Sequence, residues 1–321
     1  MTPRTVYIAL QQFAEWSERP VRLLEEAGFS VRRNQLGRRP SPADLAEALQ
    51  DADAVLAGVE PYDAALLTRL PRLACISRCG IGTDAIDLEA AKRLGIAVLT
   101  TPDEVMEPVA EMSVAMILAL ARNLPQHSRE AAAGQWVKRI GVLLSEWTIG
   151  LVGFGRIGRA VAGLLRPFGP RLLAADPGIS PADVPQGIEL CPLSALLAAS
   201  DLVSLHAVRR KDEGPLLGPQ ELALMKRGSF LVNTSRGYLV DEPALHDRLV
   251  SGHLAGAALD VFETEPYTGP LARLPQVLAT PHVATLTCAS RAAMELRCAR
   301  NVIEFFARRQ AEAPAAGSRH G

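Results

Sequence analysis

The chain has 321 residues, of which 48% are hydrophobic, and its formal net charge is −1. This length allows two domains, and this composition allows a large core and excludes wholesale disorder. The balanced charge argues against a general nucleic-acid or membrane surface. The N-terminal MTPRTVYIALQQ is too short and polar for a secretory signal, and the apolar run 114–121 is far shorter than a membrane span. We therefore expect a cytoplasmic protein.

The cysteine spacing agrees with that compartment. The cysteines are Cys75, Cys79, Cys191, Cys288 and Cys298, and none forms a C-x-x-C pair. This pattern predicts reduced, mostly buried thiols, with no disulfide framework and no metal site.

The first hundred residues alternate short apolar runs with helical segments. Strands are expected at residues 6–10, 29–32, 54–57, 73–77 and 96–99. Helices are expected from Pro20, Ser41, Asp63 and Asp87, because proline suits a first helical turn and serine or aspartate caps one. Such alternation predicts a parallel sheet with helices on both faces.

The rest of the chain predicts a second alternating domain. Residues 104–124 are expected to form one long helix leading into it. Further helices are expected at 193–199, 219–225 and after Asp241, and strands at 202–206, 229–233, 256–260 and 277–280. The last helix is expected over 287–308, followed by a disordered tail at 311–321, which is rich in Ala, Gly and Ser.

Residues 148–160, TIGLVGFGRIGRA, run from an apolar strand through three spaced glycines into helical sequence. Gly153 allows a tight turn, and Gly155 lets the backbone approach a pyrophosphate. Gly158 lets the following helix pack close to the strand. The helix N-terminus then offers free N–H groups to phosphate oxygens. This strand–turn–helix context predicts a dinucleotide site.

An acid follows at the expected distance. Asp176 ends the apolar run 171–176, 18 residues after Gly158, and suits hydrogen bonds to ribose hydroxyls. Residues 177–180 contain no arginine for a 2′-phosphate, so the pattern favours NAD over NADP. The alternative is an ordinary βαβ turn with an incidental aspartate.

Three later stretches can supply chemistry, and each follows an apolar strand: VNTSRG (232–237), ALDVFETEP (258–266) and TPHV (280–283). Arg236 could grip a carboxylate with its fork of donors, or could lie in a surface turn. His282 follows a strand and has candidate acids upstream, and histidine is the natural proton donor to a carbonyl oxygen. His206, which ends a strand, is expected at the cofactor rim. The basic run Arg209–Lys211 is either a solvated loop or a source of positive potential for an anionic substrate.

Together these motifs resemble the D-2-hydroxyacid dehydrogenases, with the phosphoglycerate dehydrogenase-like branch as the best match. GFGRIG, ADP (175–177), VNTSRG, AALDVFETEP and TPHVA occur in this order, and SRCGIGTD (77–84), DLEAAKRLGIAV and VAE (109–111) precede them. The resemblance spans residues 1 to about 308.

The resemblance implies a fold of two doubly wound parallel-sheet domains, with a Rossmann NAD-binding domain inserted in a flavodoxin-like substrate domain. We expect the substrate domain at 1–101 and 284–310 and the NAD domain at 102–283, with the active site in the cleft. The family also implies a homodimer formed through the NAD domains.

Roles are implied for individual residues. His282 matches the acid/base, Glu265 its paired acid, and Arg236 the clamp on the substrate carboxylate. Asp260 matches a residue near the nicotinamide carboxamide. The expected NAD contacts are Gly153, Gly155, Arg156, Ile157, Gly158, Asp176, His206, Thr234, Arg236, Asp260 and His282. The expected substrate contacts are Arg236, Arg78, which binds the substrate's charged end, and Gly80, Ile81 and Gly82, whose N–H groups receive the carboxylate.

The sequence departs from the family in three places. HAVRRK (206–211) lacks a common proline, and TTPDEV (100–105) replaces a common Asn-Thr-Pro-Gly-x-Asn segment. Because the sequence stops shortly after the last expected helix, we also expect no regulatory C-terminal domain like that of many phosphoglycerate dehydrogenases. The first two departures leave the substrate open between 3-phosphoglycerate, hydroxypyruvate or glyoxylate, and another 2-hydroxy acid with a second anionic group, and the third argues against feedback control by serine. A non-enzymatic NAD(H)-sensing protein, similar to the C-terminal-binding corepressors, is the alternative from another class.

Overall fold

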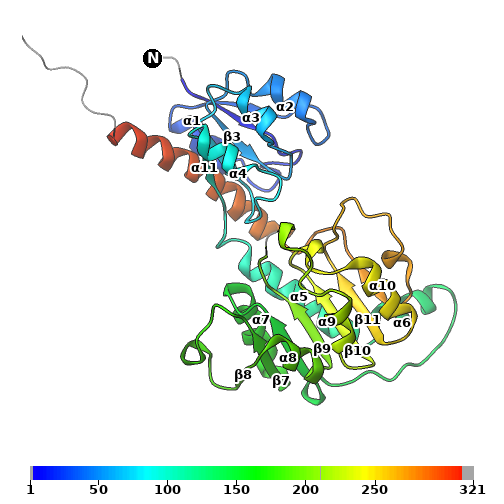
Figure 1. Cartoon of the computed structure of the whole chain (residues 1–321). Coiled ribbons are helices and arrows are strands. Elements are labelled where there is room, and N and C mark those ends of the chain that lie inside the picture. Colours follow the sequence, from blue (N-terminus) through cyan, green and yellow to red (C-terminus); the bar gives the residue numbers. More distant parts are fainter. Residues whose placement is uncertain (1–2, 210, 313–321) are drawn as a thin grey trace, which may run out of the picture. The chain divides into compact units, whose positions relative to one another are not determined.

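The computed structural model describes residues 3–209 and 211–312 and divides the chain into two units (Figure 1). The first unit is Met1–Val105 with Leu286–Gly321, and the second is Met106–Thr285. The first segment of the first unit thus ends at Val105, and the second unit ends at Thr285. From the sequence, these two boundaries were expected after residues 101 and 283. Both units are parallel α/β structures, which confirms the expected fold class.

The first unit has a parallel sheet in the order β2-β1-β3-β4-β5, the doubly wound order of flavodoxin-like folds. Its strands are β1 (Thr5–Ile8), β2 (Ser30–Arg33), β3 (Ala54–Ala57), β4 (Cys75–Arg78) and β5 (Ala97–Leu99). Its helices are α1 (Arg19–Glu26), α2 (Pro42–Ala48), α3 (Ala64–Thr68), α4 (Leu88–Arg93) and α11 (Cys288–Glu312). Helices α1 and α11 pack side by side on one face, and α2, α3 and α4 bury their apolar side chains on the other.

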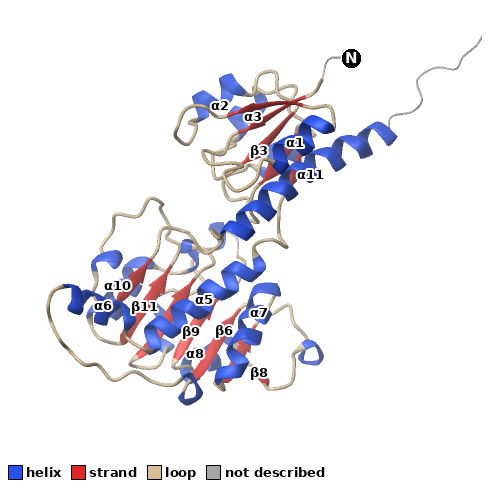
Figure 2. Ribbon diagram, turned by 180° about the vertical axis from the view of Figure 1, so that it is seen from behind, coloured by secondary structure: helices blue, strands red, loops and turns tan. Residues whose placement is uncertain are grey.

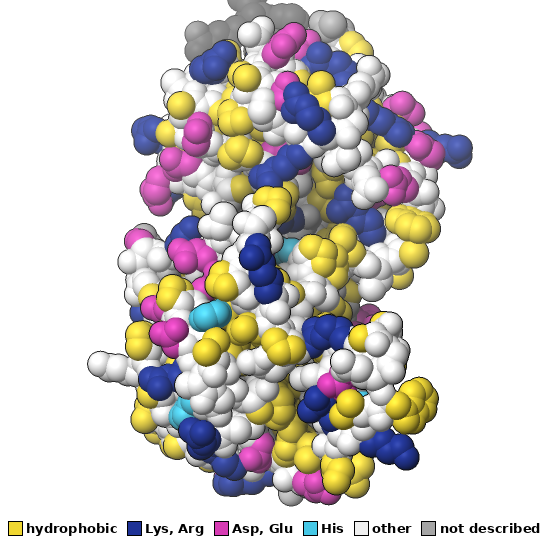
Figure 3. Space-filling model, turned by 90° about the vertical axis from the view of Figure 1, so that its right-hand side faces the viewer, with side chains coloured by type: hydrophobic (Ala, Val, Ile, Leu, Met, Phe, Trp, Pro, Cys, Tyr) yellow, Lys and Arg dark blue, Asp and Glu magenta, His cyan; other side chains and the backbone are white. Residues whose placement is uncertain are grey.

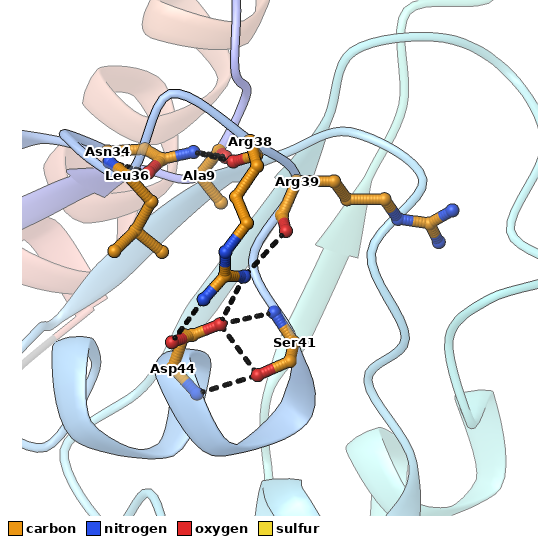
Figure 4. Close-up of polar contacts among 7 residues, drawn as sticks. All are labelled: Ala9, Asn34, Leu36, Arg38, Arg39, Ser41 and Asp44. Atoms are coloured by element: carbon orange, nitrogen blue, oxygen red, sulfur yellow. Dashed lines mark hydrogen bonds and ion pairs between the residues drawn. The ribbon is translucent and has the colours of Figure 1, made fainter.

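The loop before α2 is braced by polar side chains (Figure 4). Ser41 caps α2 by accepting the Asp44 N–H, as expected, and the Asp44 carboxylate accepts the Ser41 N–H in return. Arg38 donates two hydrogen bonds to the Asp44 carboxylate, at 2.7 and 3.1 Å. These contacts lower the pKa of Asp44, with the Arg38 hydrogen bonds as the largest cause. Asn34 donates to the carbonyls of Ala9 and Arg38, which ties the loop to the end of β1.

The second unit has a larger parallel sheet in the order β12-β11-β10-β9-β6-β7-β8. Its strands are β6 (Thr148–Val152), β7 (Arg171–Ala175), β8 (Ile188–Leu190), β9 (Leu202–Leu205), β10 (Ser229–Asn233), β11 (Leu254–Leu259) and β12 (Val277–Ala279). Its α-helices are α5 (Met106–Ala121), α6 (Leu124–Ala132), α7 (Arg156–Leu165), α8 (Leu193–Ala199), α9 (Pro219–Leu224) and α10 (Glu242–Val250). Helices α5 and α7 lie side by side on one face (Figure 2), and α8, α9 and α10 pack on the other.

Short 3₁₀ turns complete the described chain. They are η1 (Leu144–Glu146), η2 (Arg166–Phe168), η3 (Pro181–Asp183), η4 (Lys211–Glu213), η5 (Gly237–Leu239) and η6 (Leu271–Arg273).

Two expected helix ends are wrong. The single helix expected over 104–124 instead ends at Ala121, and α6 begins at Leu124. Asn123 adopts a left-handed conformation (φ 51°) between them, and Pro125 lies in the first turn of α6, where its missing N–H costs nothing. The last helix runs to Glu312, because residues 309–312 (RQAE) are good helix formers. Residues 311 and 312 are therefore helical, and the rest of the expected tail, 313–321, lies outside the described residues.

Basic and acidic side chains are interspersed over the face of the molecule in Figure 3, as the small net charge suggests. No helix in the described part of the chain is long and apolar enough to cross a membrane.

Candidate active site

The glycine loop joins β6 to the N-terminus of α7. Gly153 has φ 87°, and a Cβ there would lie 2.5 Å from the backbone nitrogen of Ala207. A Cβ on Gly158 would lie 2.3 Å from the carbonyl oxygen of Gly153, so only glycine allows this approach. Beside Gly155, in contrast, there is open space. Arg156 and Ile157 are the first two residues of α7, and their expected contact with a cofactor phosphate stays a prediction.

Asp176 lies directly after β7 and beside this loop. Its two carboxylate oxygens accept the backbone N–H groups of Phe154 (2.7 Å) and Gly178 (2.8 Å). These hydrogen bonds fix the carboxylate at the end of the strand, where ligands bind in doubly wound sheets. Its expected role as a ribose ligand stays a prediction.

His206 and Thr234 follow the neighbouring strands β9 and β10. The Nε2 atom of His206 lies 3.0 Å from the Ser204 hydroxyl, and burial lowers the pKa of His206 to about 4. This imidazole is therefore neutral at pH 7 and is a poor proton donor. The Thr234 hydroxyl lies 2.8 Å from that of Ser113 on α5, a contact that the sequence analysis missed.

His282 and Glu265 form a hydrogen-bonded pair of titratable side chains in this unit. The Nδ1 atom of His282 lies 2.8 Å from Glu265 Oε2, and both side chains are partly exposed. Burial acts to raise the pKa of Glu265, but hydrogen bonds from His282 and the Phe262 N–H outweigh it, and the pKa is lowered. The carboxylate is thus ionised and orients the imidazole ring through Nδ1, and Nε2 is the ring nitrogen that this contact leaves for proton exchange.

Asp260 is fully buried and holds the turn that carries His282. Its carboxylate accepts hydrogen bonds from the Thr280 hydroxyl (2.5 Å) and from the N–H groups of Val283 and Ala284 (2.9 Å each). Its carbonyl accepts the His282 N–H at 2.8 Å. Three donors thus engage the carboxylate within the protein, and its place near a nicotinamide carboxamide stays a prediction. Neither Thr280 nor this bracing role had been singled out from the sequence.

Arg236 follows β10 and is brought toward Glu265 by a close backbone contact. A Cβ on the next residue, Gly237, would lie 1.9 Å from the carbonyl carbon of Phe262, so only glycine fits. Asn233 donates to the Arg236 carbonyl at 2.9 Å and shapes the same loop. The Arg236 guanidinium is close enough to contribute to the lowered pKa of Glu265, so these side chains share one neighbourhood.

The remaining expected substrate residues, Arg78 and Gly80 to Gly82, belong to the first unit. They lie at the carboxyl end of β4, and Arg78 donates a hydrogen bond to the carbonyl of Cys79. The Gly80 N–H donates to the Thr101 hydroxyl at 2.8 Å and is therefore used within the unit. Thr101 was not selected from the sequence, although a hydroxyl just after the neighbouring strand β5 is a signal that could have found it.

The basic run after β9 forms contacts within its own loop. Arg209 lies 3.4 Å from the Glu213 carboxylate and donates to the Glu213 carbonyl at 2.9 Å. Its own carbonyl accepts the Tyr238 hydroxyl at 3.1 Å. These contacts favour the interpretation of the basic run as part of a solvated loop over its interpretation as a source of positive potential for a substrate. Arg210 lies outside the described residues.

The residues of the second unit fit NAD. The Nδ1 atom of His206 is buried and has no hydrogen-bond partner among the described residues, beside a glycine loop that leaves open space at Gly155. The N-terminus of α7 offers N–H groups to a pyrophosphate, and Asp176 stands at the end of the adjacent strand β7.

Comparisons with known proteins agree with this geometry. Residues 114–284 match the family model described as D-isomer specific 2-hydroxyacid dehydrogenase, NAD binding domain. The chain is 38% identical over 253 residues to D-3-phosphoglycerate dehydrogenase of Mycobacterium tuberculosis, covering 77% of this chain and 48% of that protein. The chain thus spans about half the length of the D-3-phosphoglycerate dehydrogenases from mycobacteria that it matches.

Two further similar proteins align with this chain over most of its length and most of their own. A glyoxylate reductase of Korarchaeum cryptofilum is 37% identical over 277 residues, with 83% of each chain covered. The crystal structure of the TT0316 protein from Thermus thermophilus superposes with a TM-score of 0.85 at 33% identity, covering 94% of this chain and 97% of that one. The chain belongs to the D-isomer specific 2-hydroxyacid dehydrogenase family, and its second unit contains the NAD-binding domain of that family.

Proposed function

We propose that the protein is an NAD-dependent D-2-hydroxyacid dehydrogenase, which interconverts a 2-keto acid and a D-2-hydroxy acid. The observation that carries this proposal is the 2.8 Å contact between His282 and Glu265 beside Arg236, in the unit that contains the NAD-binding domain.

Each side chain has one role in the proposed reduction. Arg236 binds the substrate carboxylate and carbonyl with two parallel N–H donors. Glu265 holds His282 through Nδ1, and Nε2 of protonated His282 gives its proton to the C2 oxygen as hydride reaches C2. NADH, when bound, supplies that hydride. In the oxidative direction, neutral His282 removes the hydroxyl proton.

The names of two relatives and the charge of one side chain support our ranking of the substrates. One similar protein is named a D-3-phosphoglycerate dehydrogenase and another a glyoxylate reductase. Arg78 at the end of β4 favours a substrate with a second anionic group. We therefore place 3-phosphoglycerate oxidation first, and hydroxypyruvate or glyoxylate reduction second.

A substrate panel tests the proposal. The purified protein is mixed with NADH and with phosphohydroxypyruvate, hydroxypyruvate, glyoxylate or pyruvate, and the loss of NADH absorbance is followed. NADH oxidation with one of these acids supports the proposal and ranks the substrates. NADH binding without oxidation of any 2-keto acid would favour the NAD(H)-sensing alternative.

We also propose that the protein forms a homodimer through its second unit. Four large apolar side chains around α6 and the loop after it are exposed: Leu124 (54%), Trp136 (88%), Ile140 (97%) and Leu143 (63%). Exposed apolar side chains that gather in one segment mark association surfaces. A second copy of the chain is the occupant that this family implies.

A further inference from the structure

Two cysteine side chains from distant parts of the chain meet inside the first unit. Cys79 directly follows β4, and Cys298 lies on α11. Both belong to the buried cluster that α11 forms with the sheet, and their thiols share a hydrogen bond. Both are free thiols, as are the other cysteines of the chain. Two thiols in contact can exchange electrons with an oxidant as a pair, which a single thiol cannot do.

Hydrogen bonds between β4 and α11 hold the two thiols beside each other. The Cys298 sulfur lies 3.8 Å from the Ser77 carbonyl oxygen, and the Ser77 hydroxyl donates to the Cys298 carbonyl at 3.1 Å. Asn301, further along the same helix, donates to the Ser77 hydroxyl at 3.3 Å. The Cys79 N–H continues the strand ladder by donating to the Ala57 carbonyl at 2.8 Å. Both cysteines are therefore carried by hydrogen-bonded backbone.

The surroundings of the pair favour ionisation of Cys79 over that of Cys298. The hydrogen bond from Cys298 is the largest cause that acts on Cys79, and it lowers the pKa of that thiol. The guanidinium groups of Arg291 and Arg78 lower this pKa further, against the opposing effects of burial and of Glu295. Burial is the largest cause for Cys298, whose pKa is raised. Since the thiolate is the nucleophile, Cys79 is the sulfur that attacks first.

The two side chains also differ in their contact with solvent. Cys79 is 4% exposed, whereas Cys298 is fully buried behind it. A small oxidant that enters from solvent therefore meets Cys79 first. A nucleophilic thiol on the solvent side with a second thiol in contact with it is the arrangement in which oxidation proceeds to a disulfide.

We propose that Cys79 and Cys298 form a site of reversible oxidation, at which a peroxide converts the two thiols into one intrachain disulfide bond. The Cys79 thiolate attacks the O–O bond of hydrogen peroxide and becomes a sulfenic acid, and the departing hydroxide takes up a proton to form water. The Cys298 thiol then attacks the Cys79 sulfur, the S–O bond breaks, and a second water leaves. Two thiols are thus oxidised by two electrons, and one peroxide is reduced to two waters.

Peroxide treatment of the Cys191→Ser, Cys288→Ser double variant tests the proposal. This full-length variant keeps only the three cysteines of the cluster, Cys75, Cys79 and Cys298. After treatment, unfolding and alkylation, the number of free thiols should fall from three to one. Peptide mass spectrometry should find Cys79 joined to Cys298, and dithiothreitol should restore all three thiols. Three free thiols after treatment would overturn the proposal.

Cys75→Ala in the same background is the matched control. Cys75 lies on the same strand and in the same cluster and is fully buried, but burial raises its pKa to about 12. Its loss should leave the yield of the disulfide unchanged. Cys298→Ser should abolish the disulfide and leave a sulfenic acid on Cys79 that dimedone traps. A disulfide that contains Cys75 would contradict the assignment of the pair.

The wild type provides a measurement that does not depend on how the variants fold. Peptide mass spectrometry of the peroxide-treated wild type should find the same Cys79–Cys298 link, although the exposed Cys288 is oxidised as well. Absence of this link would overturn the proposal. The proposal concerns the first unit alone and holds whichever acid is the substrate.

Discussion

At the scale of single residues, His282 is held in a conformation that it would rarely adopt alone. Its φ of 54° lies in the left-handed region, which costs a non-glycine residue about 1–2 kcal/mol. The Asp260 carbonyl accepts the His282 N–H, and the Asp260 carboxylate binds the next two N–H groups. The buried aspartate thus offsets the strain and aims the imidazole beside Glu265.

His282→Gln should lower kcat by about 10²–10⁴-fold, because the proposed proton donor to the C2 oxygen is lost. NADH binding should persist, since the glycine loop and Asp176 are untouched. Steady-state kinetics and a fluorescence titration with NADH check both statements. His246→Gln is the control, because His246 lies on α10, where its ring is 3.7 Å from the Asp247 carboxylate, and its loss should leave kcat unchanged. Near-normal turnover of His282→Gln would remove this residue from the mechanism.

His206 should make the protein sensitive to acid. Its folded pKa of about 4 is lower than the ordinary value of 6.5, so the unfolded chain takes up a proton first as pH falls. The stability that comes from neutral His206 is fully present above pH 6.5 and is lost progressively down to about pH 4.

Thermal unfolding of the wild type and His206→Asn tests this between pH 7 and pH 4. The Tm of the wild type should fall by several degrees more than that of the variant over this range. Parallel curves for the two proteins would show that His206 titrates normally in the folded state.

At the scale of elements, the site depends on two loops that approach more closely than side chains allow. The turn after β10 touches the segment after β11 at Gly237, where a Cβ would lie 1.9 Å from the Phe262 backbone. This contact carries Arg236 toward Glu265. The two backbone segments cannot move apart without displacing Arg236 or Glu265.

Gly237→Ala should therefore destabilise the protein by about 2–4 kcal/mol and lower kcat/KM sharply. Urea unfolding and steady-state kinetics measure the two effects. The control is Gly163→Ala within α7, where the new Cβ meets nothing within 4 Å. That exchange should stabilise the protein by about 1 kcal/mol and leave kcat/KM unchanged, because alanine is the better helix former. Equal effects of the two substitutions would contradict this interpretation of Gly237.

At the scale of the whole molecule, we expect the exposed apolar side chains around α6 to form the interface of the proposed homodimer. Replacing Trp136 and Ile140 together by serine removes the two most exposed of them. The double variant should sediment as a monomer at concentrations where the wild type is a dimer, with little change in Tm measured at low protein concentration. A wild type that sediments as a monomer would overturn the proposed homodimer. A double variant that stays dimeric would show that the dimer interface lies elsewhere.

Local signals in the sequence predicted much of this architecture. Ser41, Asp87 and Asp241 cap their helices as expected, and β3, β10 and α8 have the expected bounds. These features depend on neighbouring residues alone: a side-chain oxygen three positions before an N–H, or a run of apolar residues. The break at Asn123 was missed, because it depends on a left-handed residue inside an otherwise continuous helical pattern.

The sequence by itself determined the alternation of strands and helices, the glycine loop, and the candidates Arg236, Glu265 and His282. Only the tertiary structure decided which of their neighbours hold them. Asp260 binds the turn that carries His282, and Thr101 takes the Gly80 N–H. Such partners lie about 20 residues or more apart along the chain and meet only because parallel strands bring their carboxyl ends to one edge of a sheet. A hydrogen bond between strand ends follows from that packing, which no local pattern encodes.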